Sequence, residues 1–237
     1  MLTLNFYLSF SVLLVSFLSG GFFLWRWAHG KRHQTFLLYW GVGFLFLSLF
    51  KIPNILAHAG VPIVQTDFYS FFFVTLVAYL LSYCAFNRGL ETFIKTPRRT
   101  TGIFCFSALL VAAIFYFALT FFKGPITSYP VWLGHIFFYI PAQLFMLHTV
   151  WLTSFPLKTT LAIPHEATAL AALGILLLLV SSLFYIFLQA WPHPLQPQFW
   201  YFSVINSSAL SLIQIISQIF LFFGLRGFAH ASLKHTR

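Results

Sequence analysis

One lysine stands inside an otherwise apolar segment, "LFLSLFKIPNILAHAG" at residues 45–60, and its ammonium could do chemistry. A charge in an apolar helix is costly unless it reaches the membrane surface, pairs with an acid or binds an anionic or carbonyl group. Lys51 lies a few residues from the end of the segment, so its stem could extend to the lipid headgroups. Asp67 follows a short loop, and a hairpin would return it to the depth of Lys51. Snorkelling, a Lys51–Asp67 pair and a ligand site therefore all stay open.

Polar residues also recur at helical spacing in the last apolar segment, "YFSVINSSALSLIQIISQIF" at residues 201–220. Five of its polar residues follow one another at intervals of 4, 4, 3 and 4, which places them on one face of a helix: Ser203, Ser207, Ser211, Gln214 and Gln218. Such a face either joins neighbouring helices or lines a cavity. Further polar residues at helical spacing in earlier segments are Thr75, Tyr79, Ser82, Tyr83 and Gln143.

If these faces surround a common interior, they form a pocket that opens toward the outer side. The predicted pocket residues are Lys51, Asn54, Asp67, His135, Tyr139, Ser203, Ser207, Ser211, Gln214 and Gln218. Whether they meet depends on the lateral order of the helices.

No catalytic residue, metal site or cofactor is predicted. The acids Asp67, Glu91 and Glu166 lie at helix ends or in loops, and no H-E-x-x-H motif or nucleophile–base pair occurs at recognisable spacing. His135 and His148 differ by about 220° around a helix, so they do not share the face that bis-histidine haem ligation needs. We therefore expect a protein that is not an enzyme.

The cysteines Cys84 and Cys105 are too few for a disulfide framework. Both fall near the predicted cytoplasmic ends of their helices, where thiols stay reduced. We expect them to be small apolar packing residues.

The elements that position these residues follow from the composition: 60% of the 237 residues are hydrophobic, 7% are charged and the mean hydropathy is +0.89. Soluble domains carry about 25% charged residues. An all-α integral membrane protein is therefore predicted, as a single seven-helix transmembrane domain over 1–237. The N-terminal apolar run is too long for a signal peptide and is expected to stay as the first span. The seven segments of about 20 apolar residues or more are 4–27, 35–57, 67–87, 102–122, 130–152, 167–190 and 198–225.

The basic residues predict the orientation. Of the 13 lysines and arginines, two (Lys51 and Lys123) fall on one side. The eleven on the other side are Arg26, Lys31, Arg32, Arg88, Lys95, Arg98, Arg99, Lys158, Arg226, Lys234 and Arg237. Loops rich in lysine and arginine face the cytoplasm, so the N-terminus is predicted outside and the C-terminus inside. The same loops would contact anionic lipid headgroups, which explains the net charge of +10 without nucleic acid.

Two stretches carry a resemblance to a known class of membrane domain. Residues 25–50, "WRWAHGKRHQTFLLYWGVGFLFLSLF", and residues 78–93, "AYLLSYCAFNRGLETF", resemble parts of the multi-helix input domains of bacterial sensor histidine kinases and diguanylate cyclases. The resemblance covers about a fifth of the chain and assigns no binding residue. Those sensors continue into an output domain, whereas this chain ends about ten residues after the last segment.

The resemblance and the outer polar cluster favour a receptor-like binding protein of the bacterial inner membrane that acts through a protein partner or oligomer. An accessory or assembly subunit of a larger membrane complex is the first alternative. A facilitator for a small neutral or lipid-like solute is the second.

Overall fold

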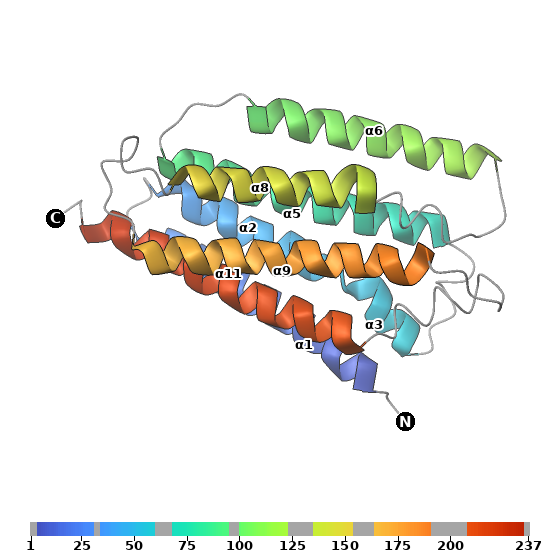
Figure 1. Ribbon diagram of the computed structural model, residues 1–237, viewed down its shortest axis with the longest axis horizontal. Helices are drawn as coiled ribbons and strands as arrows, with labels where there is room; N and C mark the ends of the chain where they lie inside the picture. The colour runs from blue at the N-terminus through green and yellow to red at the C-terminus, as the bar shows by residue number, and fades with distance from the viewer. Residues whose placement is uncertain are drawn as a thin grey trace.

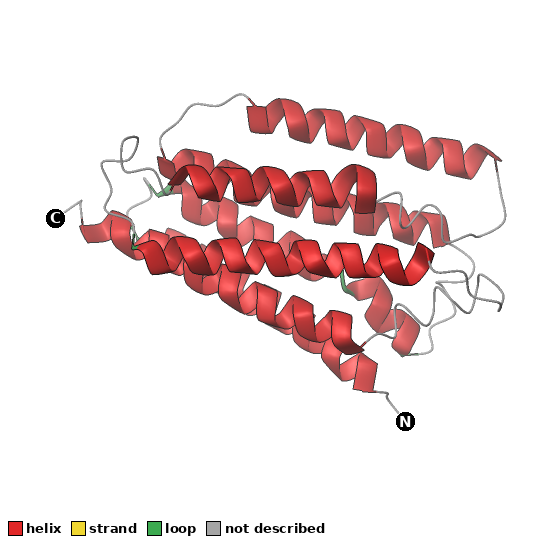
Figure 2. Ribbon diagram, viewed as in Figure 1, coloured by secondary structure: helices red, strands yellow, loops and turns green. Residues whose placement is uncertain are grey.

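The computed structural model describes residues 4–30, 34–59, 68–94, 100–122, 135–153, 164–190 and 208–234. These residues are helical apart from a few at helix ends and at the junction of residues 50 and 51, with no strand among them (Figures 1 and 2). The elements are α1 (Leu4–His29), α2 (Thr35–Leu49), α3 (Ile52–His58), α5 (Phe68–Ile94), α6 (Thr100–Phe122), the π-helix η1 (His135–Tyr139), α8 (Ile140–Thr153), α9 (His165–Ala190) and α11 (Ser208–Lys234).

Five of these helical stretches are long and apolar enough to cross a membrane: Leu4–His29, Phe73–Ile94, His135–Leu152, His165–Phe187 and Ser208–Ala231. Thr35–Leu49 and Thr101–Ile114 are shorter apolar helices. Large apolar side chains cover the outside of the bundle, which suits contact with lipid; examples are Phe17, Phe106, Phe117 and Phe187, each more than half exposed. The described helices confirm the all-α class and are consistent with a membrane protein.

Helices α1, α2, α5, α8, α9 and α11 form a closed ring in which each packs against the next and α11 packs against α1. At this last junction Ser208 donates a hydrogen bond to Asn5 Oδ1 over 2.6 Å, and the Phe222 ring lies 5.3 Å from that of Phe22 and 5.5 Å from that of Phe23. The ring brings the first and last helices of the chain together.

Close packing at two ring junctions depends on glycine. A Cβ atom at Gly174 of α9 would lie 2.6 Å from the Leu221 amide nitrogen and 2.8 Å from the Ser217 carbonyl oxygen of α11. The Ser217 hydroxyl donates to the Gly174 carbonyl over 2.8 Å. A Cβ at Gly20 of α1 would lie 2.9 Å from the Gly41 carbonyl oxygen of α2. Small residues bring these backbones together, as is typical of helix pairs in membranes.

Helix α6 lies outside the ring, packed along α5 at the top of Figure 1. Cys84 of α5 and Cys105 of α6 form a disulfide, with their Cα atoms 5.8 Å apart. The prediction of two reduced cysteines was therefore wrong. The hairpin of α5 and α6 brings Cys105 beside Cys84, at a Cα separation that a disulfide can span. The prediction considered only the reducing conditions of the cytoplasm and not this geometry.

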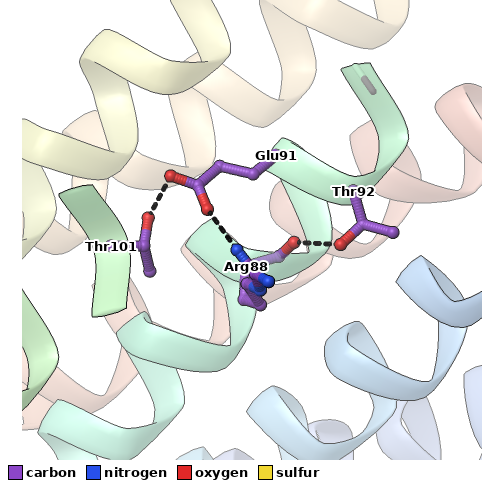
Figure 3. A network of polar contacts seen from close by, with 4 residues as sticks. All are labelled: Arg88, Glu91, Thr92 and Thr101. Carbon is purple, nitrogen blue, oxygen red and sulfur yellow. Dashed lines mark hydrogen bonds and ion pairs between the residues drawn. The ribbon is translucent and has the colours of Figure 1, made fainter. Parts of the chain in front are cut away.

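A polar network makes a second connection between α5 and α6 (Figure 3). The Glu91 carboxylate is 3% exposed; it pairs with Arg88 over 3.2 Å and accepts a hydrogen bond from the Thr101 hydroxyl. Thr92 donates to the Arg88 carbonyl over 2.7 Å. The buried carboxylate is thus compensated by a cation and a hydroxyl, as burial of a charge requires. Arg88 and Arg226, which the sequence suggested were loop residues, lie within α5 and α11 because both helices extend past the predicted ends at 87 and 225.

The disulfide gives a direct prediction. The segment between the two cysteines contains Arg88, Lys95, Arg98 and Arg99, each a site for trypsin. We expect a trypsin cut after any of them to leave two fragments that migrate together on a non-reducing gel and separate after reduction. Cys105→Ser should give separate fragments under both conditions. Separation of the wild-type fragments without reductant would contradict the disulfide.

Candidate functional site

A break in the second predicted segment places Lys51 at a helix junction. The sequence predicted one continuous helix over 35–57. The structure instead has a break there, because α2 ends at Leu49 and α3 begins at Ile52. Pro53 explains the break, because its ring clashes with the Leu49 carbonyl one turn earlier and it has no N–H to donate. Helix continuity is partly kept by hydrogen bonds from the Lys51 amide to Ser48 and from the Ile55 amide to Lys51.

The Lys51 side chain is 4% exposed, and its ammonium lies 5.3 Å from the centre of the Phe50 ring. Among the described residues, no carboxylate pairs with it. The side chain therefore does not extend along the outer surface of the bundle, and its cation–π contact gives only part of the compensation that a buried charge needs. Asp67, the predicted partner, lies outside the described residues, so that pair stays a prediction.

A second helix irregularity lies across the ring. Residues His135–Tyr139 form a π-helix that continues into α8. Pro141 accounts for it, because proline cannot donate to the carbonyl four residues earlier and the wider turn gives that carbonyl a later donor. Short π-helices are frequent at functional sites.

Aromatic contacts connect the two irregularities. The Phe50 ring lies 4.6 Å from Tyr79, Tyr79 lies 4.3 Å from Tyr139, and Tyr139 lies 4.7 Å from His135. The His135 imidazole stacks on Tyr185 at 4.4 Å. These five rings come from the junction between α2 and α3, from α5, from η1 and from α9, so the helix break and the π-helix lie beside one interior region.

Gln143 of α8 is the centre of a hydrogen-bond network beside these rings. Its side-chain nitrogen donates to the Tyr83 hydroxyl and the Ser182 hydroxyl, each over 2.9 Å, and lies 3.4 Å from the Tyr79 hydroxyl. The Tyr83 hydroxyl donates to that of Tyr79 over 3.0 Å. This network joins α5, α8 and α9 through fully buried polar atoms.

The polar stripe of the last helix is buried and contacts α9. Ser211, Gln214 and Gln218 are 3%, 9% and 2% exposed, and Gln214 donates to the Ser181 hydroxyl of α9 over 3.3 Å. The contacts therefore connect α11 to α9, as polar side chains between spanning helices do.

Several buried polar atoms lack a hydrogen-bond partner among the described residues. On η1, α8 and α11 they are Nδ1 of His135 and the side-chain oxygens of Gln143, Gln214 and Gln218, and others lie on α1, α2 and α5. An unsatisfied buried polar group costs about 1–3 kcal/mol. Beside the aromatic rings, the described residues thus offer the Lys51 ammonium and the Gln143 side-chain oxygen as groups that a ligand could satisfy.

Of the predicted pocket residues, the structure brings His135 and Tyr139 together directly and buries Lys51, Ser211, Gln214 and Gln218. Asn54 lies in α3. Asp67, Ser203 and Ser207 lie outside the described residues. The sequence interpretation missed Ser181 and Ser182, although two adjacent hydroxyls in the run "LLLLVSSLF" are a signal of an interior contact.

Two surface hollows accompany this interior region. One of about 630 Å³ lies between α8 and α9 and is lined mainly by apolar residues with His148, Trp151 and His165. Another of about 440 Å³ lies where α1, α9 and α11 meet. The described residues contain no group of three or more His, Cys, Asp and Glu side chains placed to hold a metal ion.

Comparison with known proteins assigns the chain to no family. No protein-family model matches the sequence, and no characterised protein or solved structure was found that matches it.

Proposed function

We propose that the chain is an integral membrane protein that binds a small ligand inside its helical ring and does not transform it. The observation that carries this proposal is the Lys51 ammonium, buried at a helix break that faces the π-helix through a line of aromatic rings. Among the described residues the Phe50 ring gives this ammonium only part of the compensation that a buried charge needs. An oxygen atom of a bound ligand would supply the rest.

The proposed topology has seven spans, with α2 and α3 together forming one broken span and α6 forming another. Its support is the distribution of eleven basic residues on one side and two on the other, which favours an outer N-terminus. A reporter that works only in the cytoplasm should be active when it is fused to the C-terminus, and a reporter that works only after export should be inactive there. Activity of an exported reporter at that position would refute the orientation.

The chemistry of the interior indicates the class of ligand. The Lys51 ammonium favours a carboxylate or carbonyl oxygen, and the Gln143 side-chain oxygen, which has no partner among the described residues, favours a hydroxyl or N–H donor. The contacting rings of Tyr79 and Tyr139, whose centres lie 4.3 Å apart, add flat apolar surface. We propose a small, partly apolar molecule that carries both an oxygen acceptor and a donor.

No described group completes a catalytic arrangement, since acid–base work needs a nucleophile or substrate proton within hydrogen-bond reach of a base. We therefore propose binding with a report to a protein partner in the membrane. The contacts favour neither an accessory subunit of a larger complex nor a facilitator of a small solute. The experiment below has a distinct outcome for each of these two alternatives.

Gentle purification from the native membrane tests the proposal. We expect a small molecule, identified by mass spectrometry of the extracted protein, to be present in stoichiometric amount and to bind again saturably to the stripped protein. A stable assembly with other proteins and no small molecule would favour the accessory subunit. A protein that passes a solute across vesicles without retaining it would favour the facilitator.

A further inference from the structure

A hollow at one end of the bundle has the composition of an anion site. It has a volume of about 440 Å³ and lies where α9 begins and where α1 and α11 approach their ends, at the left of Figure 1. Its polar lining consists of Arg26 from α1, Arg226 and His230 from α11, and Glu166 from the first turn of α9. Three helices far apart in sequence thus contribute charged or titratable groups to one small space.

Among the described residues neither of the two arginines forms an ion pair, although Glu166 lines the same hollow. The two guanidinium groups line one small space, so their like charges repel each other. Arg226 lies over the Phe22 ring at 5.9 Å, which orients it without neutralising it. An anion between the two guanidinium groups would convert their repulsion into charge-assisted hydrogen bonds.

The rest of the lining changes from polar to apolar along the helices. On α11, Phe223 precedes Arg226 and His230 on the way to the C-terminus, and on α9, Leu170 lies one turn inside Glu166. Phe223 is 46% exposed, so the apolar part of the hollow continues onto the outer surface of the bundle. If a lipid phosphate bound at the charged end, the acyl chains of that lipid could lie along this apolar surface.

We propose that this hollow binds a phosphate group between Arg26 and Arg226. An anionic phospholipid headgroup is the source that the polar-to-apolar lining favours, and a soluble phosphate is the alternative source with the same chemistry. Glu166 opposes binding through its negative charge and sets the affinity. The site is separate from the interior region around Lys51 and does not depend on the function proposed for it.

The test uses the full-length protein in a neutral detergent, with thermal unfolding followed against added ligand. We expect phosphatidylglycerol to raise the unfolding temperature saturably, whereas the zwitterionic phosphatidylcholine raises it much less. Arg26→Gln and Arg226→Gln should each weaken the effect of phosphatidylglycerol by about tenfold, the value of one lost charge-assisted contact. Arg99→Gln, which removes the same charge from the segment between α5 and α6, should leave it unchanged. Inorganic phosphate is the second probe: a saturable effect that is lost in the same two variants would assign the site to a soluble phosphate.

A second variant decides the matter even if an arginine variant fails to fold. Glu166→Gln removes the competing carboxylate, so it should bind phosphatidylglycerol several-fold more tightly than the wild type. Equal weakening by Arg26→Gln and Arg99→Gln would mean general attraction to a basic surface and would overturn the proposal. No tightening in Glu166→Gln would overturn it as well.

Discussion

Replacing Gly174 by leucine is expected to unfold most of the protein. The new Cβ alone would meet the Leu221 amide nitrogen at 2.6 Å and the Ser217 carbonyl oxygen at 2.8 Å, and both are backbone atoms that cannot rotate away. Separating α9 from α11 would also break the 2.8 Å hydrogen bond from Ser217 to Gly174. Overpacking usually costs 1–3 kcal/mol, and a clash with backbone should reach about 3 kcal/mol or more. Size-exclusion chromatography after graded heating would measure the loss.

Two adjacent glycines of α1 provide the matched control. A Cβ at Gly20 would lie 2.9 Å from the Gly41 carbonyl oxygen, whereas a Cβ at Gly21 has nothing within 4 Å. Gly20→Leu should therefore destabilise the bundle and Gly21→Leu should be tolerated, although both change helix propensity and hydrophobicity equally. If Gly21→Leu were as harmful as Gly174→Leu, the packing explanation would be wrong.

Lys51→Met should abolish ligand binding without weakening the fold. Loss of an ammonium that contacts a carboxylate or carbonyl oxygen should lower affinity by at least about tenfold, on the scale of a hydrogen bond to a charged group. If Lys51 has no carboxylate partner, as holds among the described residues, the unfolding temperature of the ligand-free variant should equal or exceed that of the wild type, because a buried charge is replaced by an apolar chain of similar length. Binding of the purified ligand and thermal unfolding of the stripped protein measure the two effects separately.

Asp67→Asn separates the ligand explanation from a structural ion pair. If Lys51 pairs with Asp67, both substitutions should lower stability by similar amounts, since each leaves one charge alone. If Lys51 binds a ligand, Lys51→Met should affect binding while Asp67→Asn leaves affinity nearly unchanged. Ser16→Ala is a neutral control, because the Ser16 hydroxyl is buried and has no hydrogen-bond partner among the described residues.

The helices were predictable because each apolar segment had the length that a spanning helix requires. Helical spacing also predicted that Ser211, Gln214 and Gln218 share a face, and all three are buried. The break after Leu49 had a local signal in Pro53, but the apolar segment was long enough to be taken as one helix. Local residue chemistry thus carries most of the secondary structure.

The lateral order of the helices was not predictable. A single sequence predicts how far along its helix each residue lies, but it does not predict which helices contact one another. The Cys84–Cys105 pair depends on α6 packing outside α5. The opposition of Arg26 and Arg226 depends on contact between the first and last helices. Both features depend on how different helices pack together. The spacing of apolar and polar residues within one helix carries no information about that packing.

The junction between α1 and α11 has a consequence for biogenesis. α1 is synthesised before α11, and their contact includes the 2.6 Å hydrogen bond from Ser208 to Asn5. Until α11 has been made, the ring is open on one side, and the buried serines of α1 lack the cover that α11 gives them. Closure of the ring therefore waits for α11, and α1 spends the synthesis of the intervening helices with polar groups uncovered.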